Sequence, residues 1–288
     1  MRGLLAVSLI ACGGSGGSGG AEEAARPVIL QVKGSDTMVN LMQRLSEAFT
    51  GVEASVIVSV TGGGSGTGIK ALIDGTTDLA ASSREMKEAE IELAGKNNVT
   101  PVRHIVAFDG LSVYVHADNP ISEITFEQLK CIYSVDGPCH KWSDLGIALD
   151  CGGSDNIIKL SRQNNSGTYE YFREVVLGST GKFTNTLDQS GTQQVIDVVA
   201  TSKCAIGYGG IGYYKDGARS ACVKSDPAAP CVVPSVETVK SGAYALGRSL
   251  QVYTNGAPTG AQQKFLDWVL SPAGQAVVVD AGFVDLKK

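Results

Sequence analysis

The sequence predicts an α/β protein with two lobes. In the first 84 residues, strand-like and helix-like segments alternate, and each strand leads into its helix through a turn of small, hydroxyl-bearing or glycine residues. The chain has 288 residues, which is long enough for a large core divided between two lobes. In an α/β sheet the ligand lies at the carboxyl ends of the strands, so we expect these turns to form a binding site.

The first half of the chain supplies three of these strand-to-helix units. Strands are predicted at residues 28–32, 56–60 and 78–81, followed by turns at 33–38, 61–68 and 82–84. The helix after the first turn carries its apolar residues on one face. These are Met38, Leu41, Met42, Leu45 and Phe49. The helix after the second turn carries Ile69, Leu72 and Ile73.

Residues 105–115 read as two strands broken at Asp109-Gly110, because this dipeptide is typical of turns. We interpret this segment as a crossing from one lobe to the next. A helix is predicted to begin within residues 125–129, and a compact turn at residues 141–146.

A further strand at residues 157–160 enters a polar turn that ends in a helix. Tyr169, Phe172, Val176 and Leu177 mark the apolar face of that helix, and Asn165 or Ser166 would be its N-cap. The N–H groups of residues 166–168 would then point out of the helix start, with Arg162 nearby. Such donors suit an oxyanion. The alternative is an ordinary capped helix with a surface arginine.

The last part of the chain is predicted to contain a helix at residues 193–199 and a buried strand at 205–208. Residues 249–254 are predicted to form a strand that pairs with the end of the chain. Two amphipathic helices follow, at residues 261–270 and 272–279.

Composition excludes several classes of function. The net charge of −5 and the pI near 5.3 argue against a protein that binds nucleic acid or a membrane surface, since no basic field would steer it there. After the N-terminus, no apolar run approaches the length of a transmembrane helix.

The N-terminus resembles an export signal. Residues 1–12 combine one positive charge with a short apolar run, and Leu9-Ile10-Ala11-Cys12 resembles a bacterial lipobox in which Cys12 is lipidated. A plain secretory signal with an incidental cysteine is the alternative. Residues 13–26 are rich in glycine and serine and would form a flexible tether, although a cloning linker would look the same.

Six cysteines remain when Cys12 is set aside, and an even number in an exported protein predicts three disulfides, for which 15 pairings are possible. We prefer Cys131 with Cys139 and Cys222 with Cys231, because each pair closes a short loop containing proline or glycine. Cys151 with Cys204 then follows. The cysteines and the three histidines lack the spacing of metal ligands, so no metal is expected.

The glycine-rich turn at residues 61–68 does not match better-known loops. It lacks the Gly-Lys-Ser/Thr of a P-loop, the third glycine of a dinucleotide fingerprint and the glycine spacing of a nucleophile elbow. What remains is a turn whose backbone N–H groups and Ser65 could cradle an anion, or else a flexible loop without function.

The turns together resemble the phosphate-binding proteins that deliver phosphate to ABC importers, within the two-lobed periplasmic binding-protein class. The resemblance covers roughly residues 27–288 in the expected order. It is carried by residues 34–38, 63–69, 78–84 and 162–168, and by scaffold segments at 205–208 and 268–275.

This resemblance implies a cleft between two lobes, each a mixed sheet flanked by helices, joined by two hinge strands. Residues 27–110 and 247–288 would form lobe 1, and residues 111–246 would form lobe 2. The ligand set carried over is Thr37, Met38, Ser65 and Ser83 from lobe 1, with Arg84 beside them, and Arg162, Ser166, Gly167 and Thr168 from lobe 2.

Two positions depart from the family pattern. Some members place a carboxylate where Ser83 stands, to accept the proton of monohydrogen phosphate; we expect Asp109 to take that role, although it could be a structural turn residue. Asp36 is a weaker candidate and is expected to be a helix cap. Members also often carry an acidic residue where Asn164 stands, which would orient Arg162.

The expected function is therefore capture of inorganic phosphate by lobe closure, without chemistry or cofactor, and delivery to the membrane subunits of an ABC importer. The protein would be a monomer, exported and held at the membrane by its lipid alone, in the periplasm or at the cell surface. Alternatives are a binder, sensor or scavenger of another tetrahedral oxyanion, a secreted phosphate-ester hydrolase, and a structural lipoprotein with a vestigial cleft.

Overall fold

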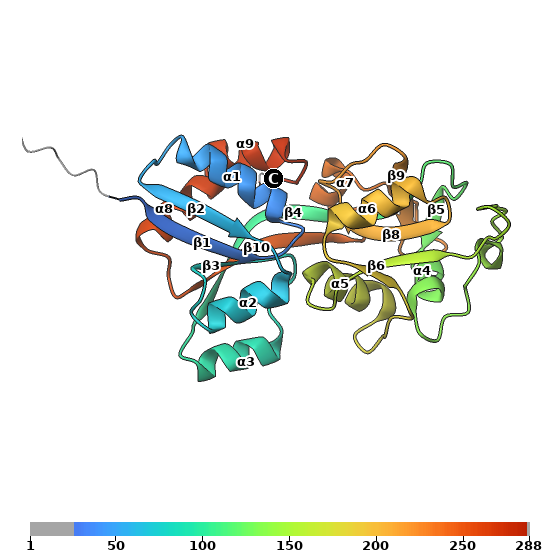
Figure 1. The fold of residues 1–288 in the computed structure, drawn as a ribbon, viewed down its shortest axis with the longest axis horizontal. Coiled ribbons are helices and arrows are strands. Elements are labelled where there is room, and N and C mark those ends of the chain that lie inside the picture. Colours follow the sequence, from blue (N-terminus) through green and yellow to red (C-terminus); the bar gives the residue numbers. More distant parts are fainter. Residues whose placement is uncertain (1–25, 287–288) are drawn as a thin grey trace, which may run out of the picture.

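The computed structural model describes residues 26–286, which form two lobes side by side along the longest axis (Figure 1). The sheet order is β2-β1-β3-β10-β4-β8-β6-β7, with β9 beside β4 and β5 beside β9. Both halves contain parallel and antiparallel pairs and are flanked by helices, so the predicted fold class is confirmed. The predicted signal with Cys12, and all of the predicted tether except Arg26, lie outside the described residues.

Lobe 1 is built around five strands, of which the first three are parallel. They are β1 (Val28–Gly34), β2 (Val56–Thr61), β3 (Leu79–Ser82), β10 (Gly247–Asn255) and the first part of β4 (Pro101–His116). Helices α1 (Val39–Thr50), α8 (Gly260–Leu270) and α9 (Pro272–Asp280) lie on one side, and α2 (Ser65–Ile73) and α3 (Glu88–Lys96) lie on the other (Figure 1).

Lobe 2 uses the second part of β4 and five further strands. These are β5 (Glu123–Thr125), β6 (Ile158–Arg162), β7 (Leu187–Gln189), β8 (Ala205–Gly210) and β9 (Ala218–Lys224). Its helices are α4 (Phe126–Tyr133), η1 (Trp142–Leu145), α5 (Gly167–Phe172), its π-helical continuation η2 (Arg173–Leu177), α6 (Thr192–Thr201) and α7 (Val236–Lys240). No helix within residues 26–286 has both the length and the apolar character needed to cross a membrane.

Aromatic packing in lobe 2 fixes the strand and helix that carry the predicted anion turn. The rings of Phe172 on α5 and Tyr208 on β8 stack with centroids 4.0 Å apart, and Tyr133 packs edge-on against both. The Tyr208 hydroxyl also lies 2.6 Å from Ser161 Oγ, directly before Arg162. The turn is therefore held on both sides by the lobe's core.

The crossing between the lobes differs from the prediction of two strands broken at Asp109-Gly110. β4 is one continuous strand, which pairs with β10 up to Gly110 and with β8 from Leu111 onward. Asp109 lies opposite Arg248 in the β4–β10 ladder, so the dipeptide continues the sheet instead of turning. β4 and the start of β10 are the two hinge strands.

The prediction that residues 249–254 pair with the end of the chain is wrong. β10 lies between β3 and β4 and is antiparallel to both. Among the last residues that the structure describes, up to residue 286, one bridge forms, between Val284 and Phe108 of β4. β10 returns the chain from lobe 2 to the middle of the first sheet, where both of its edges are covered by neighbouring strands.

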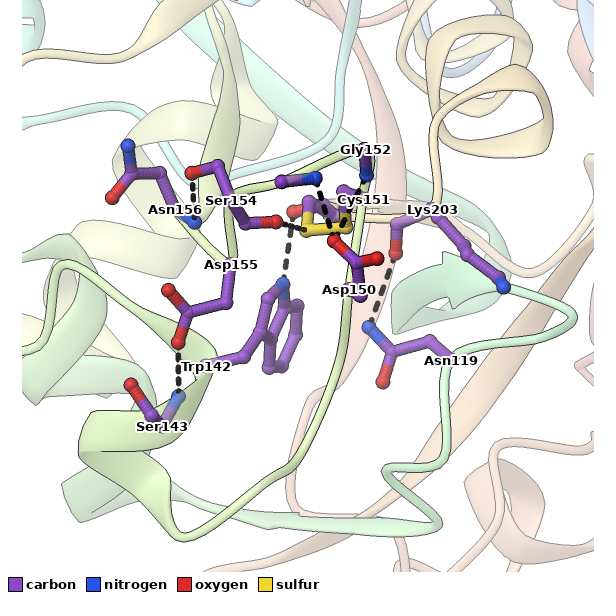
Figure 2. The surroundings of a disulfide bond; sticks show 12 residues. Asn119, Trp142, Ser143, Asp150, Cys151, Gly152, Ser154, Asp155, Asn156 and Lys203 are labelled. Carbon is purple, nitrogen blue, oxygen red and sulfur yellow. Dashed lines mark hydrogen bonds between the residues drawn. A yellow bond between two sulfur atoms is a disulfide. The ribbon is translucent and has the colours of Figure 1, made fainter.

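All three preferred disulfide pairings are confirmed. Figure 2 shows Cys151–Cys204, which joins the loop before β6 to the start of β8, with the Trp142 indole N–H donating to the Cys204 carbonyl at 3.1 Å. Glu123 lies close to Cys222 and Cys231, but these two sulfurs are bonded to each other and do not offer metal ligands as thiolates.

The disulfides should differ in what they contribute to stability. Cys151–Cys204 spans 53 residues and Cys131–Cys139 spans 8, so the chain-entropy model gives losses of about 4 and about 2.5 kcal/mol on removal. Replacing each pair by serines and measuring urea unfolding should rank the two variants in this order. The reverse order would show that closure of the long loop is not what stabilises lobe 2.

Candidate functional site

Residues from four predicted turns converge between the lobes. One wall of this cleft comes from the turns after β1, β2 and β3 in lobe 1, and the other comes from the turn after β6 in lobe 2. Side chains of this kind are usually solvated, yet here they are 3% exposed or less. They are Thr37, Ser65, Ser83, Arg162, Ser166 and Thr168.

Hydroxyl groups make the centre of the cleft. Ser35 Oγ–H donates to Ser83 Oγ at 3.0 Å, and Ser65 Oγ lies 3.3 Å from Ser83 Oγ. Across the cleft, the hydroxyl oxygens of Thr37 and Thr168 are 2.7 Å apart. Because a hydroxyl can turn to donate or to accept, this cluster can redirect its protons toward an anion.

Glycine is required where the two walls meet. A Cβ on Gly167 would lie 2.3 Å from Ser65 Oγ and 2.7 Å from Ser83 Oγ. On the opposite wall, Gly64 has φ of +90°, and a Cβ there would lie 2.6 Å from the Asn165 carbonyl oxygen. The Asn165 carbonyl also accepts the Gly66 N–H at 3.0 Å. The lobes are therefore in contact, as in a closed state.

Ser166, rather than Asn165, is the N-cap of α5. Its Oγ accepts the Thr168 N–H at 3.2 Å and the Tyr169 N–H at 3.5 Å. In lobe 1, the Met38 N–H donates to the Ser35 carbonyl at 3.0 Å. The backbone groups of Met38 and Thr168 are thus already hydrogen-bonded within their own turns, and a ligand would have to compete for them.

Arg162 is fully buried at the end of β6. Its Nε–H donates to the Gln189 carbonyl at 3.3 Å, its Nη1–H to Thr192 Oγ1 at 3.0 Å and its Nη2–H to the Ser190 carbonyl at 2.8 Å. Burial lowers the pKa of the guanidinium, and the nearby Asp36 carboxylate opposes that shift.

The prediction that Asp36 is a helix cap is wrong. The N-cap of α1 is Met38, which makes no side-chain capping bond. The Asp36 carboxylate instead accepts the Gly63 N–H at 2.7 Å and a second Nη2–H of Arg162 at 3.2 Å. The carboxylate partner of Arg162 therefore comes from the opposite wall.

Arg84 is directed toward α3. Its two Nη atoms bind both carboxylate oxygens of Glu90, at 2.7 and 2.6 Å. The Arg84 side chain is 8% exposed, and its Nη2 approaches Gly66 at the edge of the cleft. This ion pair holds the guanidinium at the edge of the cleft, near Gly66.

Asp109 lies in the hinge with both carboxylate oxygens occupied. Arg248 donates to Oδ2 from Nε at 3.0 Å and from Nη2 at 2.7 Å, and the Ile211 N–H donates to Oδ1 at 3.2 Å. Burial raises the pKa of the carboxyl, and the Arg248 guanidinium opposes that shift. Gly210 separates Asp109 from Thr37, since a Cβ there would lie 2.9 Å from the carboxylate and 3.0 Å from Thr37 Cγ2.

Sequence reasoning missed Arg248 and Tyr213. Arg248 lies near the start of β10, and only the register of β10 against β4 places it opposite Asp109. Tyr213 of lobe 2 donates its hydroxyl to the carbonyls of Asp36 and Thr37, at 3.0 and 3.2 Å. Arg248 lies within a strand, and Tyr213 follows a glycine-rich turn whose composition does not indicate the role of the tyrosine hydroxyl.

This fold and this cleft define the class of protein. The family model described as the PBP superfamily domain matches residues 21–273, so the chain belongs to that superfamily. Within it, the chain belongs to the family of the phosphate-binding protein PstS. The PstS of Pseudomonas aeruginosa is 34% identical over 264 residues, covering 88% of this chain and 81% of the relative.

Two further comparisons agree. The phosphate-binding protein PstS of Staphylococcus saprophyticus is 31% identical over 283 residues, covering 96% of this chain and 86% of the relative. Among solved structures, a protein from Clostridium perfringens described as a phosphate ABC transporter substrate-binding protein with bound phosphate has a TM-score of 0.79 at 26% identity. That match covers 90% of this chain and all of the other.

Removing one partner of the hinge ion pair should destabilise the protein. Asp109→Ala leaves the 7%-exposed Arg248 without its partner, which should lower the free energy of unfolding by about 3–5 kcal/mol in phosphate-free urea titrations. Glu85→Ala, which removes the exposed ion pair with Arg103, is the control and should cost about 1 kcal/mol or less. Equal losses in the two variants would contradict a structural role for the Asp109–Arg248 pair.

Proposed function

We propose that this protein captures inorganic phosphate in the cleft between its lobes and delivers it to the membrane subunits of an ABC importer. The observation that carries the proposal is a set of buried hydroxyl groups that two lobes bring together, with the buried Arg162 bonded to Asp36 in the turn that also carries Thr37. The relatives named for phosphate binding, and the related structure described with bound phosphate, support it.

The proposed ligand set draws on both walls. Lobe 1, residues 27–110 and 247–288, would contribute Thr37, Met38, Ser65 and Ser83, and lobe 2, residues 111–246, would contribute Arg162, Ser166, Gly167 and Thr168. Arg84 would act from the edge through its charge. These donors address the main energetic difficulty, since a dehydrated dianion is costly unless each oxygen is hydrogen-bonded.

The strength of the donors is sufficient for tight binding. A charge-assisted hydrogen bond contributes about 1.5–3 kcal/mol, whereas micromolar binding requires about 8 kcal/mol in total. Several such bonds therefore exceed the requirement after the cost of ordering the ligand and side chains is subtracted. The same donors would also accept sulfate, so the choice of phosphate needs a proton acceptor.

We assign the acceptor role to Asp109. Its carboxylate is fully buried, and Gly210 lies between it and Thr37. Burial raises the pKa of the Asp109 carboxyl and so favours the sharing of a proton with the ligand. A protonated phosphate oxygen could donate toward this group, whereas an unprotonated sulfate oxygen would be repelled. Arg248 would keep the carboxylate in place while the lobes open and close.

Transport would proceed without a chemical step on the ligand. The lobes would separate about β4 and β10 to admit phosphate and close on it, as hinge-bending binding proteins do. The protein would act as an exported monomer, in the periplasm or at the cell surface, held at the membrane through lipid on Cys12. It would be a carrier and not an enzyme.

Removing the arginine should abolish most of the affinity. Arg162→Ala should raise the phosphate Kd by about 30-fold or more in titration calorimetry, because a buried charge-assisted donor is lost. Arg173→Ala is the control: Arg173 follows α5 in the same lobe, pairs with Glu170, and should change the Kd by about twofold at most. An unchanged phosphate Kd in Arg162→Ala would show that binding does not depend on this arginine and would contradict the proposed site.

A preference for another oxyanion is tested by comparing the affinities for sulfate and phosphate. Sulfate should bind the wild-type protein at least about 100-fold more weakly than phosphate at neutral pH, since facing a buried carboxylate costs an unprotonated anion several kcal/mol. Calorimetric titration of each salt into the same preparation measures this ratio. Comparable affinities would overturn the proton-acceptor role of Asp109 and favour a general oxyanion binder.

A further inference from the structure

Asp36 connects the two walls of the cleft through its side chain and its backbone. One carboxylate oxygen, Oδ1, accepts the Gly63 N–H at 2.7 Å, which fixes the side chain within lobe 1. The other, Oδ2, lies 3.2 Å from Nη2 of Arg162 in lobe 2. The carboxylate therefore spans the cleft from a fixed position on one wall to the principal cation on the other.

Within its own lobe, Arg162 is held by neutral groups. Its acceptors there are the carbonyls of Gln189 and Ser190 and the hydroxyl of Thr192. Of the carboxylates in residues 26–286, Asp36 is the one within ion-pair distance of this guanidinium. Opening the hinge would move that counter-charge away, because Asp36 and Arg162 belong to different lobes.

A second interlobe bond reaches the same turn. The Tyr213 hydroxyl, from lobe 2, donates to the backbone carbonyls of Asp36 and Thr37. Thr37 in turn faces Thr168 across the cleft at 2.7 Å. The position of the Asp36–Thr37 turn relative to Arg162 is thus set by contacts that require the lobes to be closed.

We propose that Asp36 is a positioning residue that latches Arg162 in its anion-binding orientation when the lobes close, and so slows phosphate release. The latch rests on the proposed function. Its place on the rim fits this role: the Asp36 side chain is 20% exposed and lines a hollow of about 220 Å³ together with Ser190, Thr192 and Tyr213. Access of solvent to that hollow would weaken the repulsion between the carboxylate and a bound anion.

Another interlobe ion pair provides a comparison. Lys87 Nζ lies 3.1 Å from Glu170 Oε1, with the lysine side chain 48% exposed, and this pair does not touch Arg162. Lys87→Gln therefore removes an interlobe attraction without disturbing the arginine. Asp78 provides the other control, because its carboxylate accepts the Gln31 N–H at 2.7 Å entirely within lobe 1.

The test compares Asp36→Asn with Asp78→Asn and Lys87→Gln in the full chain. For Asp36→Asn we expect the phosphate Kd to rise about tenfold, within the usual range for coupled sites, mostly through faster release in stopped-flow measurements. The melting temperature without phosphate should stay within about 2 °C of wild type, because the open protein lacks the latch. Both control variants should bind within about twofold of wild type.

Three outcomes would overturn the latch. Wild-type affinity in Asp36→Asn would show that Arg162 needs no carboxylate. A lower melting temperature without phosphate, together with an unchanged Kd, would show a purely structural role. An equal loss in Lys87→Gln would show general attraction between the lobes and not positioning of Arg162. If the wild-type protein itself gave no binding heat with phosphate, the proposed function would fail first, and the latch with it.

Discussion

The close approach of Gly167 to Ser65 and Ser83 is the constraint on which the cleft depends. A side chain as small as a methyl group would meet both hydroxyl oxygens at less than 3 Å, so the walls can close only because this position carries none. Closure then brings Thr37 against Thr168 and the Gly66 N–H against the Asn165 carbonyl. Each wall alone is a set of polar turns, and the buried site exists only when the two meet.

Two buried arginines have carboxylate partners, and these ion pairs differ in what they join. Arg248 and Asp109 are opposite each other in adjoining hinge strands, so we expect the pair to stay together when the lobes rotate about that hinge. Arg162 and Asp36 face each other across the cleft and separate when it opens. Because the desolvation of buried ion pairs offsets much of their attraction, we interpret both as fixing geometry more than as adding stability.

Local composition makes much of the fold, and the turns of both walls, predictable from the sequence. Glycine and hydroxyl residues at strand ends marked the turns, and Ser166 was one of two N-caps expected. The sequence does not reveal that β4 is continuous, because Asp109-Gly110 is typical of a turn. The residue that pairs with Asp109, Arg248, lies 139 residues away and cannot be identified from local composition. The role of Asp36 is hidden for the same reason, because its partner Arg162 is 126 residues away in the sequence. A helix cap, in contrast, can be predicted from the residues next to it.

Phosphate capture between the lobes is tested most directly by a crystal structure of the protein grown with phosphate and without sulfate. We expect tetrahedral density enclosed between the two walls, with oxygens within about 3 Å of the hydroxyls of Ser65, Ser83 and Thr168 and of the Arg162 guanidinium. Closed lobes with an empty cleft, or phosphate bound only outside it, would contradict the claim that this protein captures phosphate between its lobes.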